Sequence, residues 1–367
     1  MQPTRRIWMQ TGAATMAAQL QAQQQMKIGI IGCGARARQH WGALLKMPDA
    51  RITALADVES DRMAEVNGQL AQKAATYTDY RELLKDSNVG VVVIVTPGYL
   101  HHEMALAALR AGKDVVLEKP LAMNYAQAKE IERETARTKR ILAVCMQRRY
   151  MKPDAETRDA VENGAIGAIR LITCTEMRGD WNPRTWQYMD PATGKKTSWR
   201  LLKKTAGSTE LEFSVHAFAE VCSLVKSPVV RVAATGGVVH YRDRDTRDVS
   251  SLIADFGNGA RFSYAFSCFA AGGGNTFSIV GDKGVLTRSG GKVLIRRERG
   301  REEVWTPATP VSGEDAEIQL YRDFFRNVRE RSQPLLSVAA AMEPAKLAFA
   351  AEISISENRM VTASDFA

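Results

Sequence analysis

Glu212 and His216 are the first pair in this chain whose residue types and spacing suit acid–base chemistry. Residues four apart on a helix share one face, so the carboxylate and the imidazole would point the same way. A histidine changes its charge near neutral pH, which a general acid or base requires. The alternative is a structural histidine whose ring is hydrogen-bonded inside a half-apolar helix.

Lys119 is a second candidate for proton transfer because it directly follows the apolar, β-branched run from Asp114 to Glu118. A lysine at the end of a buried strand is partly desolvated, which lowers its pKa and allows proton exchange near neutrality. The alternative is a lysine that only pairs with Glu118 or another nearby acid.

A glycine-rich turn near the start of the chain predicts a dinucleotide site. Gly32, Gly34 and Ala37 have the G-x-G-x-x-A spacing after an apolar run. The first glycine permits a tight turn, the second lets the backbone approach a pyrophosphate, and the alanine lets the helix pack on the strand. Ala35 and Arg36 lie in this turn, at the helix N-terminus that would receive the phosphate charge. The alternative is an ordinary strand–turn–helix corner.

Asp57 supports the nucleotide interpretation. It ends a second strand, residues 51–57, about 20 residues beyond the turn, where an acid accepts hydrogen bonds from an adenosine ribose. The same carboxylate would repel a 2′-phosphate, so the sequence favours NAD over NADP, although Arg62 would partly offset it.

The elements that position these residues alternate between strand and helix. Residues 89–96 and 114–118 are strands buried on both faces, and residues 103–111 and 125–137 have helical composition. Such alternation predicts a doubly wound parallel sheet, in which ligands lie outside the carboxyl ends of the strands. The predicted cofactor residues therefore also include those that end the later strands, namely Thr96, Pro97, Glu118 and Lys119.

The chain resembles the Gfo/Idh/MocA oxidoreductases over nearly its whole length after residue 26. The resemblance rests on four segments, namely Ile31-Gly32-Cys33-Gly34 with His40, Thr96 to His101, Ala111 to Pro120, and Gln147-Arg148-Arg149-Tyr150. It implies an α/β protein with a Rossmann NAD-binding domain at residues 26–150. A C-terminal α+β domain with a mostly antiparallel open sheet, residues 151–367, would bind substrate and form oligomers.

The resemblance also implies roles for single residues. Lys119 would contact the hydroxyl that loses hydride, His216 matches the family histidine, and His101 would lie near the nicotinamide. Family members usually have Asp where this chain has Glu212, and many have Asp where it has Ala219. These two departures leave the substrate open.

The second half predicts the substrate cleft and a sheet. A strand at residues 169–176 precedes an aromatic, polar loop whose tryptophans suit stacking on a sugar, unless they only pin the loop to the domain. The predicted substrate-binding residues are Arg149, Tyr150, Trp181, Trp186, Trp199 and Arg200. Short runs between residues 229 and 288 predict an antiparallel sheet, and residues 316–331 and 342–357 predict amphipathic helices that pack back on the body.

Residues 1–25 resemble an export signal. Arg5-Arg6 and the Ala-rich stretch after it resemble the twin-arginine motif, which carries folded proteins to the periplasm, whereas a chance Arg-Arg pair would leave the protein in the cytoplasm. Free NAD is scarce outside the cytoplasm, so export predicts a tightly bound cofactor.

Three functions fit these observations. The first is an NAD(P)-dependent oxidoreductase acting on a sugar, polyol or related hydroxyl. The second is an NAD-dependent glycosidase that works by transient C3 oxidation, elimination and hydration. The third is a non-catalytic NAD-binding sensor, which the presence of both Lys119 and His216 disfavours.

Composition sets further bounds. The net charge of +9 is dispersed along the chain, so we expect no nucleic-acid partner. The five cysteines lie singly, which predicts buried thiols and no metal ligands, and the apolar stretches predict no stable membrane insertion. We expect a homo-oligomer formed through the C-terminal sheet.

Overall fold

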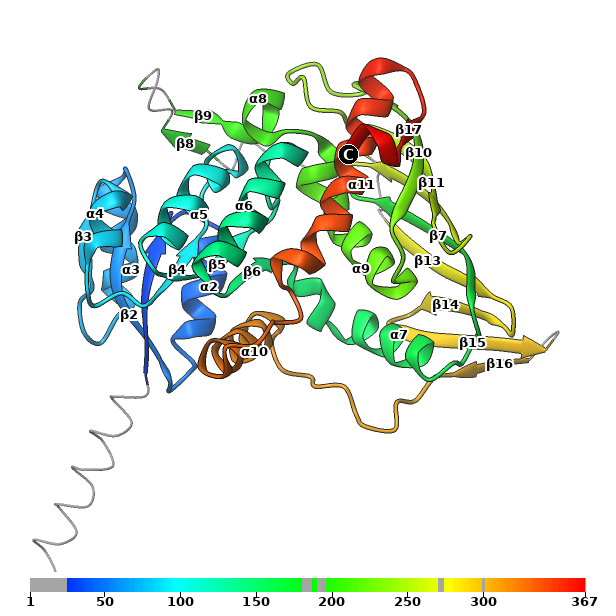
Figure 1. The fold of residues 1–367 in the computed structure, drawn as a ribbon, viewed down its shortest axis with the longest axis horizontal. Helices are drawn as coiled ribbons and strands as arrows, with labels where there is room; N and C mark the ends of the chain where they lie inside the picture. Colours follow the sequence, from blue (N-terminus) through cyan, green and yellow to red (C-terminus); the bar gives the residue numbers. More distant parts are fainter. Residues whose placement is uncertain are drawn as a thin grey trace, which may run out of the picture.

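The computed structural model describes residues 25–179, 187–189, 194, 196–269, 274–298 and 301–366. Two large sheets lie side by side, a parallel sheet built from the first part of the chain and a broad, mostly antiparallel sheet built from the second (Figure 1). The predicted fold class is confirmed.

The N-terminal sheet has the strand order β3-β2-β1-β4-β5-β6, and its pairs are parallel. Its central strands are buried along most of their length, as expected for a sheet with helices on both faces. The strands are β1 (Met26–Ile31), β2 (Ala50–Ala56), β3 (Ala75–Tyr77), β4 (Val91–Ile94), β5 (Asp114–Glu118) and β6 (Leu142–Cys145). The helices are α2 (Ala37–Leu44), α3 (Ser60–Gln69), α4 (Tyr80–Lys85), α5 (His101–Arg110) and α6 (Tyr125–Thr138).

The C-terminal sheet has nine strands in the order β16-β15-β14-β13-β7-β12-β11-β10-β17. β7 and β12 pair in parallel and the other neighbours are antiparallel. The strands are β7 (Ile169–Met177), β10 (Val229–Gly237), β11 (Val249–Phe256), β12 (Arg261–Ser267), β13 (Gly274–Gly281), β14 (Val285–Ser289), β15 (Lys292–Glu298), β16 (Arg301–Val304) and β17 (Val361–Thr362). A separate hairpin joins β8 (Gln187–Met189) to β9 (Lys196–Ser198).

Helices cover one face of this sheet (Figure 1). The helices of the second half are α7 (Lys152–Glu162), α8 (Lys203–Ala206), α9 (Val215–Val225), α10 (Ala316–Glu330) and α11 (Val338–Glu357). α11 contacts α6 of the first domain and α9 and β10 of the second, so it forms part of the boundary between them. α10 instead contacts α2, a helix that belongs to the domain of the parallel sheet.

The core follows from this arrangement. Leu347 and Ala348 of α11 and Phe324 and Phe325 of α10 are fully buried, so both C-terminal helices stabilise the layers they contact. None of the helices in the described ranges is both long enough and apolar enough to cross a membrane.

Candidate active site

The loop after β1 has the backbone geometry of a nucleotide-binding turn. Gly32 has a φ of +89°, and a Cβ placed there would lie 2.8 Å from the carbonyl oxygen of Val95. Gly34 is open by comparison, because its Cβ would meet only the Arg62 guanidinium, at 3.5 Å. Gly32 is therefore needed for the turn, and Gly34 leaves the backbone accessible to a phosphate.

Asp57 ties the second strand to this loop. Its Oδ2 accepts a hydrogen bond from the Cys33 amide at 2.7 Å, and its Oδ1 accepts one from the Glu59 amide at 2.9 Å. The side chain is buried, yet it still lines the cavity above the loop. The carboxylate is thus held in a fixed orientation beside the place where an adenosine ribose would lie.

This cavity measures about 340 Å³ and runs along the carboxyl ends of the parallel strands. The second domain contributes Trp199 and Arg200 to its lining, from η4 (Trp199–Leu201), a short 3-10 helix. The predicted residues that line it are Gly32, Gly34, Ala35, Arg36, Asp57, Thr96, Pro97, Glu118, Lys119, Trp199 and Arg200. The structure therefore brings together residues that are far apart in the sequence.

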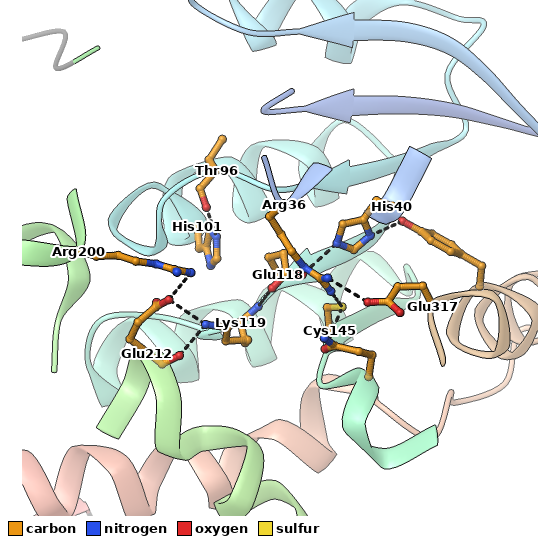
Figure 2. A network of polar contacts seen from close by, with 12 residues as sticks. Arg36, His40, Thr96, His101, Glu118, Lys119, Cys145, Arg200, Glu212 and Glu317 are labelled. Carbon is orange, nitrogen blue, oxygen red and sulfur yellow. Dashed lines mark hydrogen bonds and ion pairs between the residues drawn. The ribbon is translucent and has the colours of Figure 1, made fainter. Parts of the chain in front are cut away.

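Lys119 forms the centre of a charged cluster at one end of this cavity (Figure 2). Its Nζ donates to the Glu212 carbonyl oxygen at 2.6 Å and to Glu212 Oε1 at 2.9 Å. Arg200 reaches the same Oε1 from the η4 side at 2.6 Å. Burial lowers the pKa of Lys119, Glu212 opposes this shift, and the Arg200 charge adds to it. The amine is therefore more easily deprotonated than a surface lysine.

Glu118 belongs to a different network (Figure 2). Its Oε1 accepts from Arg36 Nε at 2.6 Å and contacts His40 Nε2 at 2.9 Å. Burial alone would raise the pKa of Glu118, but Arg36 and His40 hold it well below its usual range. Arg36 also donates to Glu317 of α10 at 2.9 Å, which links the glycine-rich turn to the C-terminal helix.

Within the described ranges, His40, Glu118 and Cys145 offer ligand atoms within 4.8 Å of one another. The Arg36 guanidinium hydrogen-bonds to Glu118 and contacts the Cys145 sulfur at 3.5 Å, so a cation already neutralises this cluster. These residues make a buried salt bridge, and we assign no metal to them.

His101 connects the two segments that follow strands β4 and β5. Its Nδ1 contacts the Pro120 carbonyl oxygen at 2.6 Å. Its Nε2 contacts the Thr96 carbonyl oxygen at 2.9 Å (Figure 2). The ring is fully buried, and burial lowers its pKa. Within the described residues, both ring nitrogens contact the backbone that follows β4 and β5, and the predicted cofactor contact of His101 stays a prediction.

Glu212 and His216 lie on either side of a change in helix type. Glu212 belongs to η5 (Glu210–Ser214), a single π-helical turn, and His216 belongs to α9. Such turns are frequent at functional sites. Glu212 faces Lys119 and Arg200, whereas His216 Nδ1 is buried with no hydrogen-bond partner in the described part of the chain. Burial, with the charges of Lys119 and Arg148, holds the pKa of His216 well below its usual range, so the ring is neutral.

A second cavity, of about 610 Å³, lies between the start of α7 and strands β7 and β13. Its walls include Arg148, Glu176 and Arg178, none of which was singled out as a site residue from the sequence. Arg148 Nη1 donates to Glu176 Oε1 at 2.7 Å, and Arg178 Nη2 lies 3.8 Å from the same oxygen. Arg148 belongs to the segment Gln147-Arg148-Arg149-Tyr150, in which nothing in the sequence distinguishes it from Arg149.

The neighbours of Arg148 point elsewhere. Arg149 is buried, donates to the Ala219 carbonyl oxygen at 3.3 Å, and has its pKa lowered to about 10 by burial. The Tyr150 hydroxyl donates to Asp323 of α10 at 2.8 Å. All three belong to η2 (Gln147–Tyr150), a 3-10 helix whose period of three sends adjacent side chains in different directions. Of the other predicted substrate residues, Trp181 and Trp186 lie outside the described residues.

Comparisons with known proteins agree with this geometry. Residues 26–146 match the oxidoreductase family with an NAD-binding Rossmann fold, and residues 155–287 match the GFO/IDH/MocA C-terminal domain. A myo-inositol 2-dehydrogenase from Thermotoga maritima is 26% identical over 351 residues, covering 92% of this chain and 98% of that protein. A levoglucosan dehydrogenase from Pseudarthrobacter phenanthrenivorans is 33% identical over 196 residues, covering 51% of this chain and 48% of that protein.

Among solved structures, a levoglucosan dehydrogenase in complex with NADH and levoglucosan superposes with a TM-score of 0.79. It is 24% identical and covers 92% of this chain and 99% of that one. The glycine-rich turn, the aspartate that follows β2 and the lysine that follows β5 thus occur in an NAD-binding domain matched by family, fold and sequence. The chain belongs to the Gfo/Idh/MocA family of NAD(P)-dependent oxidoreductases.

Proposed function

We propose that this enzyme oxidises a hydroxyl group of a sugar or polyol and transfers the hydride to NAD. The observation that carries the proposal is the Lys119–Glu212–Arg200 cluster at the end of the cofactor cavity. The inositol and levoglucosan dehydrogenases among the relatives support the same class of substrate.

The loop geometry fits the cofactor. Gly32 and Gly34 would hold the pyrophosphate, and Asp57 would accept from the ribose. NAD bound in this cavity would supply the acceptor for the hydride of the substrate C–H bond. Asp57 also disfavours a 2′-phosphate, so NAD is the expected cofactor.

Lys119 is the proposed base for the hydroxyl proton. Burial makes its neutral form accessible, and Glu212 orients the amine through two contacts, one from its carbonyl and one from its carboxylate. The neutral His216 ring has an unused Nδ1, which suits a hydrogen bond to the reacting hydroxyl or a neighbouring one. Loss of the C–H hydride and the O–H proton leaves a carbonyl.

The test begins with purified protein, whose cofactor is identified after denaturation. NAD reduction is then followed with a panel of sugars, polyols and aryl glycosides. NADH formed together with a carbonyl product supports the proposal. Release of the aryl group without net NADH formation would indicate the glycosidase, which works by transient oxidation and elimination. NAD binding without any turnover would indicate a sensor.

We also propose that Arg5-Arg6 directs twin-arginine export to the periplasm, with the cofactor bound in advance. The support is the sequence motif, because these residues lie outside the described ranges. Replacing both arginines by lysine should retain the protein in the cytoplasm, as measured by cell fractionation. An unprocessed, cytoplasmic wild-type protein that needs added NAD at every turnover would contradict this proposal.

A third proposal is a homo-oligomer formed through the open face of the C-terminal sheet. Ile253 of β11 is 60% exposed and Val280 of β13 is 37% exposed, on strands whose alternate residues are buried. Light scattering should give a mass above one chain for the wild type, and Ile253→Lys should lower that mass. A monomeric wild type would refute the proposal.

A further inference from the structure

We propose that the second cavity binds an anionic group, so that the preferred substrate is a sugar or polyol bearing a carboxylate or a phosphate. This inference rests on the proposed function and specifies its substrate class. It is carried by Arg148 and Arg178, which line the cavity.

The cavity lies close to the reacting end of the cofactor site. Arg178 packs over the ring of Phe213, at 5.2 Å, and Phe213 is the chain neighbour of Glu212. The Tyr264 hydroxyl bonds Glu176, in the cavity wall, at 2.7 Å and Ser214, in η5, at 2.9 Å. The turn that carries Glu212 is therefore connected to two residues that line the second cavity, to Arg178 through Phe213 and to Glu176 through Tyr264.

Two buried carboxylates beside the cavities each face two cations. The Glu212 carboxylate faces Lys119 and Arg200, and the Glu176 carboxylate faces Arg148 and Arg178. Each carboxylate is thus shared by two cations, and Glu176 pairs closely with Arg148 at 2.7 Å and only loosely with Arg178 at 3.8 Å.

Arg178 is the cation best placed to bind an added anion. Its Nε is buried and makes no hydrogen bond within the described residues, and its pairing with Glu176 is loose at 3.8 Å. Its side chain is 35% exposed, so a ligand in the cavity can reach it. A guanidinium with free donors binds carboxylate or phosphate in a fixed, fork-like geometry, and leaving such donors unpaired is costly.

The remaining acid of the cavity opposes an anion only weakly. Asp154 faces Arg288 at 3.2 Å, and burial raises the pKa of Asp154. The buried Glu220 carboxylate also pairs with Arg288, so Arg288 is already neutralised and the proposed anion site is at Arg178. Asn275 and Thr276 supply uncharged walls suited to sugar hydroxyls. A substrate would thus place its reacting hydroxyl at Lys119 and its anionic group toward Arg178.

The test compares matched substrates with the full-length enzyme and NAD. Glucose, galactose and mannose are each assayed beside their uronate and their 6-phosphate, with kcat/KM measured for every compound. We expect one anionic series to exceed its neutral parents by at least about tenfold, and the better series identifies carboxylate or phosphate as the group bound.

Arg178→Gln should lower kcat/KM for the preferred anion on the order of 10- to 100-fold and leave the neutral parent nearly unchanged. Arg178→Lys should recover part of the loss, because it restores the charge without the fork. Arg170→Gln is the matched control, since Arg170 is an exposed arginine on β7, the strand that precedes Arg178, and it pairs with Asp282. Added salt should raise KM for the anion and not for the neutral sugar.

The outcomes separate the two proposals. Oxidation of neutral sugars with no advantage for anions, or an equal loss for both in Arg178→Gln, overturns this inference and leaves the dehydrogenase intact. Absence of NAD reduction with every compound overturns the proposed function itself. NAD binding and thermal unfolding of each variant are measured alongside, so that a misfolded variant is recognised and Arg178→Lys decides in its place.

Discussion

Replacing Lys119 by alanine should remove proton transfer while leaving the cofactor site in place. The Nζ group makes two contacts with Glu212 and lies at one end of the cavity, whereas the pyrophosphate loop is built by other residues. A positioned general base contributes a factor on the order of 10² to 10⁴ in rate, which corresponds to about 3–5 kcal/mol of transition-state stabilisation. We therefore expect kcat to fall by that factor and NAD affinity to persist.

The assay is steady-state NAD reduction, with NAD affinity measured separately by protein fluorescence. Lys119→Arg keeps a cation beside Glu212 but cannot release a proton, so it should be as slow as Lys119→Ala. Lys129→Ala is the control, because Lys129 pairs with Glu132 on the surface of α6. Near-normal kcat in Lys119→Ala with NAD bound would show that the proton leaves by another route.

The other predictions concern cofactor choice, pH and the placement of Tyr150. Asp57→Ala should weaken NAD and relieve the repulsion of NADP, so an unchanged ratio of the two dissociation constants would count against the ribose role. Glu212→Gln removes the carboxylate that raises the pKa of Lys119, so that pKa should fall further. The acidic limb of the kcat profile should then move to lower pH, because a weaker base is deprotonated at lower pH, and a shift to higher pH would contradict this. Tyr150→Phe loses the bond to Asp323 and should lower the free energy of unfolding by about 1–2 kcal/mol. Its KM should not change, whereas a raised KM at unchanged stability would return Tyr150 to the substrate site.

Local sequence patterns predicted the cofactor end of the site because each residue there is determined by its immediate neighbours. The turn at Gly32 needs a positive φ, and Asp57 and Lys119 directly follow buried strands. In a doubly wound sheet the carboxyl ends of such strands meet at one edge. The sequence pattern alone therefore predicts that these residues lie close together.

The substrate end depends on contacts that no local pattern encodes. Arg148 and Arg149 are identical in type and adjacent, and only the direction of a 3-10 helix sends one to the cavity and the other to the Ala219 carbonyl. The helix periodicity predicted that Glu212 and His216 would share a face. The structure shows a π-helical turn between them, in which Glu212 contacts Lys119 while the Lys119 charge also acts on His216, so the shared face stays a prediction.

Glu118 and Glu212, the two carboxylates beside Lys119, have different partners. Helix α10 contributes to this difference because its Glu317 binds Arg36. Glu118 precedes Lys119 and would be its natural partner, but Oε1 of Glu118 accepts from Arg36, and Oε2 accepts from the Lys119 amide at 3.0 Å. Arg36 is held in that position by Glu317 of α10. The Lys119 amine is thereby left to Glu212, a residue of the other domain. Because the proton-transferring group is on one domain and the acid that orients it is on the other, any shift between the domains changes the environment of Lys119 directly. Closure of the domains around a substrate would therefore act on the same contact that sets how readily Lys119 gives up its proton.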